Sequence, residues 1–152
     1  MSLCFDFSED QIMMRDAIQT FCKEEIAPLV EEAEKTESFP LELYPKLAEM
    51  GLLGICFEEK YGGLGLDKVT QCILAEELGK TCAGIAKGIA AHVDLGSLPV
   101  AKFGTEEQKQ KYLVPSIAGE MIGALAITEP NAGTDARSIK TNAVKDLSLI
   151  HI

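Results

Sequence analysis

Tryptophan is absent from the 152 residues, and only 6% of them are aromatic. The hydrophobic core must therefore be built mainly from aliphatic side chains. The longest apolar stretches fall far short of the roughly 20 residues that a membrane-spanning helix needs. No basic region followed by an apolar region, the pattern of a signal peptide, precedes the predicted start of the first helix. We therefore expect a cytoplasmic protein without a membrane segment.

Positive charge is also scarce, with 14 Lys and Arg against 24 Asp and Glu and a net charge of −10. Nucleic-acid binding needs a basic face, so this class of partner is excluded. The five cysteines form no Cys-x-x-Cys pair, which argues against a disulfide scaffold or a zinc ribbon. Neither His92 nor His151 has acidic or thiol neighbours at ligand spacing. The sequence thus predicts reduced thiols and no metal site.

What the sequence does contain is the composition and periodicity of helices. Ser8 with Gln11, and Thr105 with Gln108, fit the capping box that begins a helix. After Ser8, apolar residues recur at helical spacing, which predicts one buried stripe. The pattern predicts helices from Ser8 with a kink at Pro28, from Pro40 to a stop at Gly51, from Asp67 to Gly79, from Ala83 with a weak end at Gly96 and Pro99, and from Thr105 to a bend or end at Pro115.

The character of the chain changes after Gly119. The run from Ile122 to Thr128 is apolar without helical polar spacing, which predicts a buried strand. The residues from Glu129 to Asp135 are typical of a turn. We therefore predict a mainly α fold, with a helical N-terminal domain over residues 1–119 and the beginning of a middle β-domain over residues 120–146.

Common catalytic and phosphate-binding motifs are missing. Gly79-Lys80-Thr81 is like the end of a phosphate-binding loop, but that motif needs a glycine where Leu74 stands and a preceding strand. The glycine-rich run from Tyr61 to Leu66 does not fit Gly-x-Gly-x-x-Gly. No Gly-x-Ser-x-Gly sequence offers a hydrolase nucleophile.

The most informative segment is the turn between two hydroxyl residues, Thr128 and Thr134. Small residues such as Gly133 let a backbone approach a flat ligand closely. Hydroxyl and free N–H groups can then bond ring carbonyls or phosphate. An ordinary hairpin turn explains the same residues, so residue chemistry alone leaves both interpretations open.

The run Leu125-Ala126-Ile127-Thr128-Glu129-Pro130-Asn131-Ala132-Gly133-Thr134-Asp135 closely resembles the acyl-CoA dehydrogenase signature. In that signature Thr-Glu-Pro, a small turn and Gly-Ser/Thr-Asp contact the flavin. Further segments resemble the family in its order and spacing: Glu58 to Leu66, Ala75 to Gly79, and Phe103 to Glu120. The resemblance extends from about residue 5 to residue 145. The combination is highly specific, whereas Gly-Gly-Leu-Gly alone would not be.

This resemblance implies an acyl-CoA dehydrogenase-like helical bundle, followed by the first strands of a β-barrel-like middle domain, with FAD as cofactor. The flavin contacts it implies are Leu125, Ala126, Ile127, Thr128, Gly133 and Thr134. Thr134 would also touch the acyl-CoA substrate. Ala91 and Leu95 would line the acyl-chain pocket, although plain core packing explains them equally well. Glu129 and Asp135 are expected to be turn and cap residues and not acid–base catalysts.

In this family a carboxylate removes the α-proton of an acyl-CoA while the β-hydrogen leaves as hydride to the flavin. Electrons usually pass to an electron-transferring flavoprotein, and the resemblance implies a homotetrameric parent enzyme of fatty acid metabolism. An acyl-CoA oxidase or a nitroalkane oxidase of the same fold is one alternative. A non-catalytic helical interaction module is another. Oxygen reactivity and flavin content would separate these classes.

The resemblance stops where the family continues into further strands and a C-terminal four-helix domain, which carries the catalytic carboxylate. We therefore assign no catalytic residue in this chain, and we expect an inactive fragment of low stability. Residues 147–152 fit no family pattern, and one DNA sequence that encodes them matches a widely used sequencing adapter. We predict a non-native tail there, with a natural divergent end as the alternative.

Overall fold

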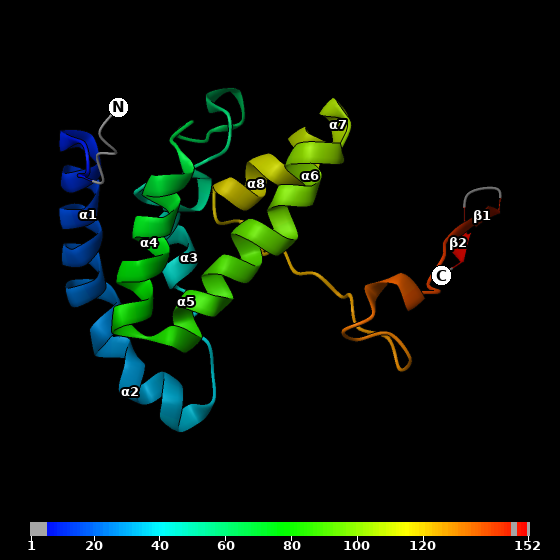
Figure 1. Ribbon diagram of the computed structural model, residues 1–152, viewed down its shortest axis with the longest axis horizontal. Coiled ribbons are helices and arrows are strands. Elements are labelled where there is room, and N and C mark those ends of the chain that lie inside the picture. The colour runs from blue at the N-terminus through cyan, green and yellow to red at the C-terminus, as the bar shows by residue number, and fades with distance from the viewer. Residues whose placement is uncertain (1–5, 147–148, 152) are drawn as a thin grey trace.

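In the computed structural model, which describes residues 6–146 and 149–151, helices occupy most of residues 9–117. The remaining chain runs away from this helical body (Figure 1). Strands in the described part are confined to β1 (Val144–Asp146) and β2 (Leu149–His151), which pair antiparallel. The prediction of a mainly helical chain is confirmed.

The first helix begins as its sequence predicts. The Ser8 hydroxyl accepts a hydrogen bond from the Gln11 amide, and the Gln11 side chain accepts one from the Ser8 amide. This capping box starts α1 (Glu9–Phe21), which continues through the π-helical turn η1 (Cys22–Ile26) into α2 (Ala27–Thr36). The predicted stripe packs into the core, where its buried members are Ile18, Phe21, Cys22 and Ile26.

Two further helical runs are composite in the same way. The first comprises α5 (Ala83–Ala90), η4 (Ala91–Ser97) and α6 (Leu98–Phe103), and the second comprises α7 (Glu106–Gln108), η5 (Lys109–Leu113) and α8 (Val114–Ile117). Thr105 and Gln108 form the second predicted capping box, at the start of α7.

A proline stands in the first turn of each α segment that follows a π turn, at Pro28, Pro99 and Pro115. Proline cannot donate to the carbonyl four residues earlier, and its ring crowds that carbonyl. A π turn changes the hydrogen-bond spacing just before the proline and so accommodates it. The prediction that the helix weakens near Pro99 is therefore wrong, because the helix continues to Phe103.

The helix α3 (Leu43–Glu49) begins later than predicted. Pro40 lies in the turn before it and accepts a hydrogen bond from the Leu43 amide at 3.1 Å. Pro45 is tolerated because the first turn of a helix leaves its amides without helical acceptors. Gly51 follows α3 with a φ of 72°, as expected of the predicted C-terminal stop.

The glycine-rich loop after η3 (Glu59–Tyr61) folds back on the chain that follows η2 (Leu52–Gly54). The Gly65 amide donates to the Phe57 carbonyl at 2.9 Å. A β-carbon on Gly63 would lie 2.1 Å from the Phe57 carbonyl oxygen, so only glycine fits at that position. Gly63 thus serves close packing between two backbone segments.

The helix α4 (Lys68–Thr81) packs between α1 and α5 (Figure 1). Asp67 caps it, as predicted, by accepting a hydrogen bond from the Thr70 amide at 2.8 Å. The predicted end at Gly79 is wrong, because the helix runs through this glycine to Thr81. A glycine weakens a helix interior by about 1 kcal/mol without ending it.

The strand predicted over residues 122–128 is not present. A strand requires a neighbour to complete its hydrogen bonds, and no described segment lies beside these residues in that way. The turn that follows is present: Glu129 and Ala132 exchange backbone hydrogen bonds of 3.0 and 3.1 Å, ahead of the short helix η6 (Ala136–Ser138). The start of a middle β-domain therefore stays a prediction. The same holds for the non-native tail, of which residues 147, 148 and 152 lie outside the described residues.

Candidate functional site

His92 joins helix η4 to the segment that leaves the helical body. Its side chain is buried, with 1% exposed. The ring Nδ1 accepts a hydrogen bond from the Gly123 amide at 2.9 Å, and Nε2 lies 3.1 Å from the Ser116 carbonyl oxygen. Because an amide only donates and a carbonyl only accepts, this arrangement requires a neutral ring with its proton on Nε2. One side chain thus connects η4, α8 and the start of segment 122–128.

The surroundings of His92 favour this neutral form. Tyr44 meets the ring edge-on, with centroids 5.2 Å apart and ring planes at 79°. The Ser97 hydroxyl donates to the His92 carbonyl at 2.9 Å. Burial lowers the pKa of His92 below its ordinary value of 6.5, and the hydrogen bond to Ser116 opposes this shift only in part. The imidazole is therefore neutral at pH 7.

A second contact between η4 and the segment lies at Gly96. A β-carbon on Gly96 would stand 2.5 Å from the carbonyl carbon of Gly123 and 2.8 Å from the Ala124 nitrogen. The two backbones therefore touch directly, which only glycine permits at this distance. His92 through its hydrogen bond, and Gly96 through direct backbone contact, together hold Gly123 against η4.

The predicted substrate residues lie on the same helix as this fastening. Ala91 precedes His92 and is partly buried, and Leu95 precedes Gly96 and is 41% exposed. The structure thus brings the helix that carries Ala91 and Leu95 against the beginning of the predicted flavin segment. Leu95 is not a core residue, which leaves its side chain available to a ligand.

The predicted flavin residues all lie beyond Gly123, and all are exposed: Leu125, Ala126, Ile127, Thr128, Gly133 and Thr134. In the described part of the chain, no backbone group of residues 124–128 and neither threonine hydroxyl forms a hydrogen bond. Nothing lies within 4 Å of a β-carbon built on Gly133. Segment 125–134 belongs to the part of the chain that runs away from the helices (Figure 1), so the structure does not pack this segment against η4.

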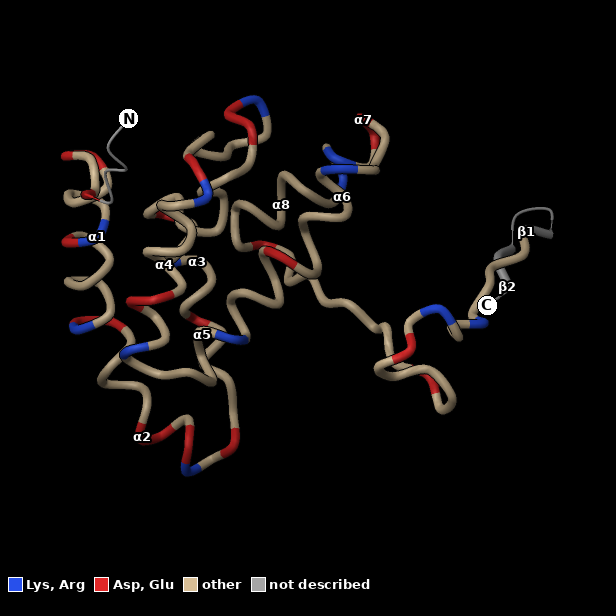
Figure 2. Tube along the Cα trace, in the orientation of Figure 1, with Lys and Arg blue, Asp and Glu red and all other residues tan. Residues whose placement is uncertain are grey.

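Segment 121–134 carries a single charged side chain, Glu129 (Figure 2). The Glu129 carboxylate accepts hydrogen bonds from the amides of Lys140 at 2.9 Å and Thr141 at 2.7 Å. The Thr141 side chain, followed by these two amides, holds the pKa of Glu129 below its ordinary value of 4.5. The charge is thus committed to closing the turn, and an anionic cofactor would meet little repulsion from this segment.

Asp135 is likewise engaged with backbone. It caps η6 by accepting a hydrogen bond from the Arg137 amide at 3.2 Å. Within η4, the Asp94 carboxylate accepts a hydrogen bond from the Gln71 side chain. Each of these carboxylates holds a structural partner, which agrees with the expectation that Glu129 and Asp135 are turn and cap residues.

The part of the chain that the structure describes has no group of three or more His, Cys, Asp or Glu placed to hold a metal ion. In the same residues, no helix combines the length and the apolar character needed to cross a membrane. Cys22, Cys56, Cys72 and Cys82 are free thiols, and Cys4 lies outside the described residues.

The sequence did not single out His92, Gly96 or Gly123 as site residues. The hydrogen-bond partners of the His92 ring lie 24 and 31 residues further along the chain, so no local spacing reveals them. One signal was available: His92 is a lone imidazole in a helix of small and aliphatic residues, where a polar ring needs a partner.

Residues 8–120 match the family profile of the acyl-CoA dehydrogenase N-terminal domain. The chain therefore belongs to the acyl-CoA dehydrogenase family. It is 42% identical over 140 residues to the short-chain specific acyl-CoA dehydrogenase of Clostridium acetobutylicum, covering 92% of this chain and 37% of that protein. It is 40% identical over 138 residues to an acyl-CoA dehydrogenase of Bacillus subtilis, covering 91% of this chain and 36% of that protein. The chain thus spans little more than a third of these relatives.

Solved structures agree with this family. A chain in a structure of the electron transferring flavoprotein of Acidaminococcus fermentans matches with a TM-score of 0.89 and 44% identity, over 95% of this chain and 38% of that one. The Bacillus anthracis acyl-CoA dehydrogenase complexed with FAD matches with a TM-score of 0.84 and 42% identity, over 91% and 24%. The prolyl acyl carrier protein oxidase AnaB matches with a TM-score of 0.84 and 34% identity, over 93% and 38%.

Proposed function

We propose that this chain is the N-terminal part of an FAD-dependent acyl-CoA dehydrogenase, which introduces a double bond between Cα and Cβ of an acyl-CoA thioester. The observation that carries the proposal is the fastening of Gly123 to η4 through His92. It joins the helix of Ala91 and Leu95 to the segment that carries the predicted flavin contacts. Family membership and the FAD complex of the Bacillus anthracis relative support the same conclusion.

The residues of the segment suit a flavin. The backbone of Leu125, Ala126 and Ile127 offers donors and acceptors that have no partner among the described residues, of the kind that bond the polar edge of an isoalloxazine ring. Thr128 and Thr134 would add hydroxyl groups, and Gly133 leaves space for close approach. When bound, FAD would supply a hydride acceptor.

The substrate would lie beside η4. Leu95 offers an exposed apolar side chain to an acyl chain, and the small side chain of Ala91 leaves room beside it. Thr134 would face both cofactor and acyl-CoA. The carboxylates near these residues are engaged with other groups, so we propose that the base is outside this chain and that the chain alone is inactive.

The remaining partners concern the longer parent protein. We propose that its electrons pass to an electron-transferring flavoprotein, in keeping with the match to a chain in the structure of such a protein from Acidaminococcus fermentans. A homotetramer and a place in fatty acid metabolism are proposals of the same kind.

Flavin uptake tests the proposal. The 152-residue chain, titrated with FAD, is expected to quench or shift flavin fluorescence in a saturable way. A Thr128→Val and Thr134→Val double variant should bind several-fold more weakly, because two hydroxyl groups are lost. The complete gene product should be yellow and should desaturate an acyl-CoA with an electron-transferring flavoprotein as acceptor. A complete protein that stays colourless in excess FAD would overturn the proposal.

An oxidase is the second candidate, favoured by the match to the prolyl acyl carrier protein oxidase AnaB. Oxygen separates the two activities. A dehydrogenase reduced by substrate would be reoxidised slowly in air, whereas an oxidase would produce one hydrogen peroxide per turnover. A helical interaction module is separated from both by the absence of flavin binding.

A further inference from the structure

We propose that His92 is a positioning residue. Its imidazole determines the position of residues 122–134, called here the flavin segment, relative to the helix that carries Ala91 and Leu95. This inference rests on the proposed function, because it concerns the geometry of that site.

The segment has little else to hold it. The amides of Glu120 and Met121 donate to the Pro115 carbonyl at 2.9 and 3.1 Å, and the chain then leaves α8. From residue 122 to residue 128 the Gly123 amide makes the one hydrogen bond found in the described part of the chain. The next bonds belong to the turn at Glu129, which is closed on itself. The direction of the segment is therefore set at Gly123.

The ring at this point cannot be exchanged for another polar side chain without loss. His92 uses both nitrogens in opposite roles, Nδ1 as acceptor and Nε2 as donor, toward groups on two different segments. An asparagine or a glutamine has an acceptor and a donor, but on a shorter or a more flexible frame. The other tautomer would set donor against donor at Gly123, and a ring flip would replace the accepting nitrogen there by a C–H group.

The ring is itself held in place by packing against a buried tyrosine. Tyr44, 4% exposed, packs edge-on against it, and the Tyr44 hydroxyl lies 3.4 Å from the Gly88 carbonyl. An acceptor fixed in this way transmits the position of η4 to Gly123, and through Gly123 to the residues that follow it.

The first test uses NMR on the unmodified 152-residue chain. The ring nitrogens of His92 should show the Nε2–H tautomer at pH 7, and the Gly123 amide should exchange with solvent much more slowly than the amides of residues 125–128. An Nδ1–H tautomer, or a Gly123 amide that exchanges as fast as its neighbours, would overturn the proposal without any variant.

The second test compares two variants. His92→Phe keeps a ring against Tyr44 but removes both nitrogens, and Gly123 exchange should accelerate by about tenfold or more. Ser97→Ala is the matched control, since it removes a buried hydrogen bond from the same helix and leaves the ring nitrogens in place. Both variants should lower thermal stability, but Ser97→Ala should leave Gly123 protected.

Flavin binding distinguishes positioning from mere stability. FAD affinity and the shape of the bound flavin absorption band should change in His92→Phe, with affinity lower by about fivefold or more, and stay unchanged in Ser97→Ala. Equal changes in both variants would reduce His92 to a structural residue and overturn the inference. If the unmodified chain takes up no FAD, the proposed function fails for this chain, while the exchange rate of Gly123 still decides whether His92 holds the segment.

Discussion

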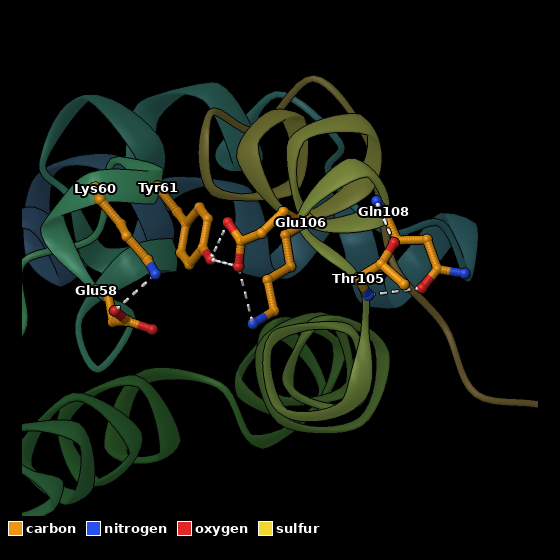
Figure 3. Close-up of polar contacts among 7 residues, drawn as sticks. Glu58, Lys60, Tyr61, Thr105, Glu106 and Gln108 are labelled. Carbon is orange, nitrogen blue, oxygen red and sulfur yellow. Dashed lines mark hydrogen bonds and ion pairs between the residues drawn. The ribbon is translucent and has the colours of Figure 1, made fainter.

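The Tyr61 hydroxyl lies 2.7 and 2.8 Å from the two carboxylate oxygens of Glu106 (Figure 3). Tyr61 ends η3 and Glu106 begins α7, so this contact joins the glycine-rich loop to the last helical run. Lys60 and Lys109 place ammonium groups 4.6 and 5.6 Å from the centre of the tyrosine ring. The Tyr61 hydroxyl, helped by both lysines, holds the pKa of Glu106 below its usual value.

Removing the Tyr61 hydroxyl should weaken the contact between the glycine-rich loop and α7. Tyr61→Phe keeps the buried ring, and we expect the midpoint of thermal unfolding to fall by roughly 2–4 °C. Tyr112→Phe is the control, because Tyr112 is 42% exposed and its hydroxyl makes no hydrogen bond in the described residues. Equal midpoints for the two variants, followed by circular dichroism, would show that the Glu106 contact contributes nothing.

Gly96→Ala should separate η4 from segment 122–128. Its new methyl group would meet the Gly123 backbone at 2.5 Å, and neither backbone can yield without moving the segment. We expect a loss of about 1–3 kcal/mol in the free energy of unfolding and faster exchange of the Gly123 amide. An unchanged amide exchange rate would show that the Gly96 contact does not hold Gly123 in place.

Gly79→Ala should change the free energy of unfolding in the opposite direction from Gly96→Ala. Gly79 lies inside α4, and nothing stands within 4 Å of a β-carbon built there. Alanine would raise the free energy of unfolding by about 0.5–1 kcal/mol, because it restricts the unfolded chain and favours helix. Urea unfolding measures this gain, and a loss of stability would restore the interpretation of Gly79 as a helix end.

Stability should depend on pH through His92. The folded state lowers the pKa of His92 below 6.5, so below that pH the unfolded chain binds the proton more readily than the folded chain. The free energy of unfolding should therefore fall as the pH drops through about 6.5, and should level off below the folded-state pKa. Urea unfolding between pH 8 and pH 5 measures the slope, which His92→Phe should flatten. An equal slope in that variant would assign the effect to other groups.

The turn at Glu129 should lose stability in a lower pH range than the one that His92 governs. Because folding lowers the pKa of Glu129, its contribution is complete above pH 4.5 and is lost as the pH falls through the folded-state value. Glu129→Gln should remove this dependence and speed exchange of the Lys140 and Thr141 amides at neutral pH. Glu120→Gln, at an exposed site outside the turn, should leave both amides unchanged.

The sequence predicted those elements whose signals are local. The capping boxes at Ser8 and Thr105 each involve residues three positions apart, and both form as expected. The buried stripe of α1 follows from helical periodicity alone. Gly79 misled the prediction because a glycine that ends a helix and a glycine inside one look alike in local sequence, and here α4 continues two residues further to Thr81.

The segment after Gly119 depended on partners that local sequence does not contain. An apolar run such as 122–128 becomes a strand when another strand pairs with it, and no described residue does so. The candidate site was located through a family resemblance, which indicated Thr128 and Thr134 but not the imidazole that fastens their segment. His92 became a site residue only when folding brought Ser116 and Gly123 to its two nitrogens.

Unpaired backbone N–H and C=O groups flanked by apolar side chains are also a template on which another polypeptide chain can add a β-strand. Leu125 and Ile127 are 48% and 52% exposed, and the backbone between them has no partner in the described chain. A flavin and a second copy of the polypeptide would therefore compete for the same row of atoms. Saturation with cofactor should keep the protein monodisperse at concentrations where the cofactor-free form assembles into larger particles.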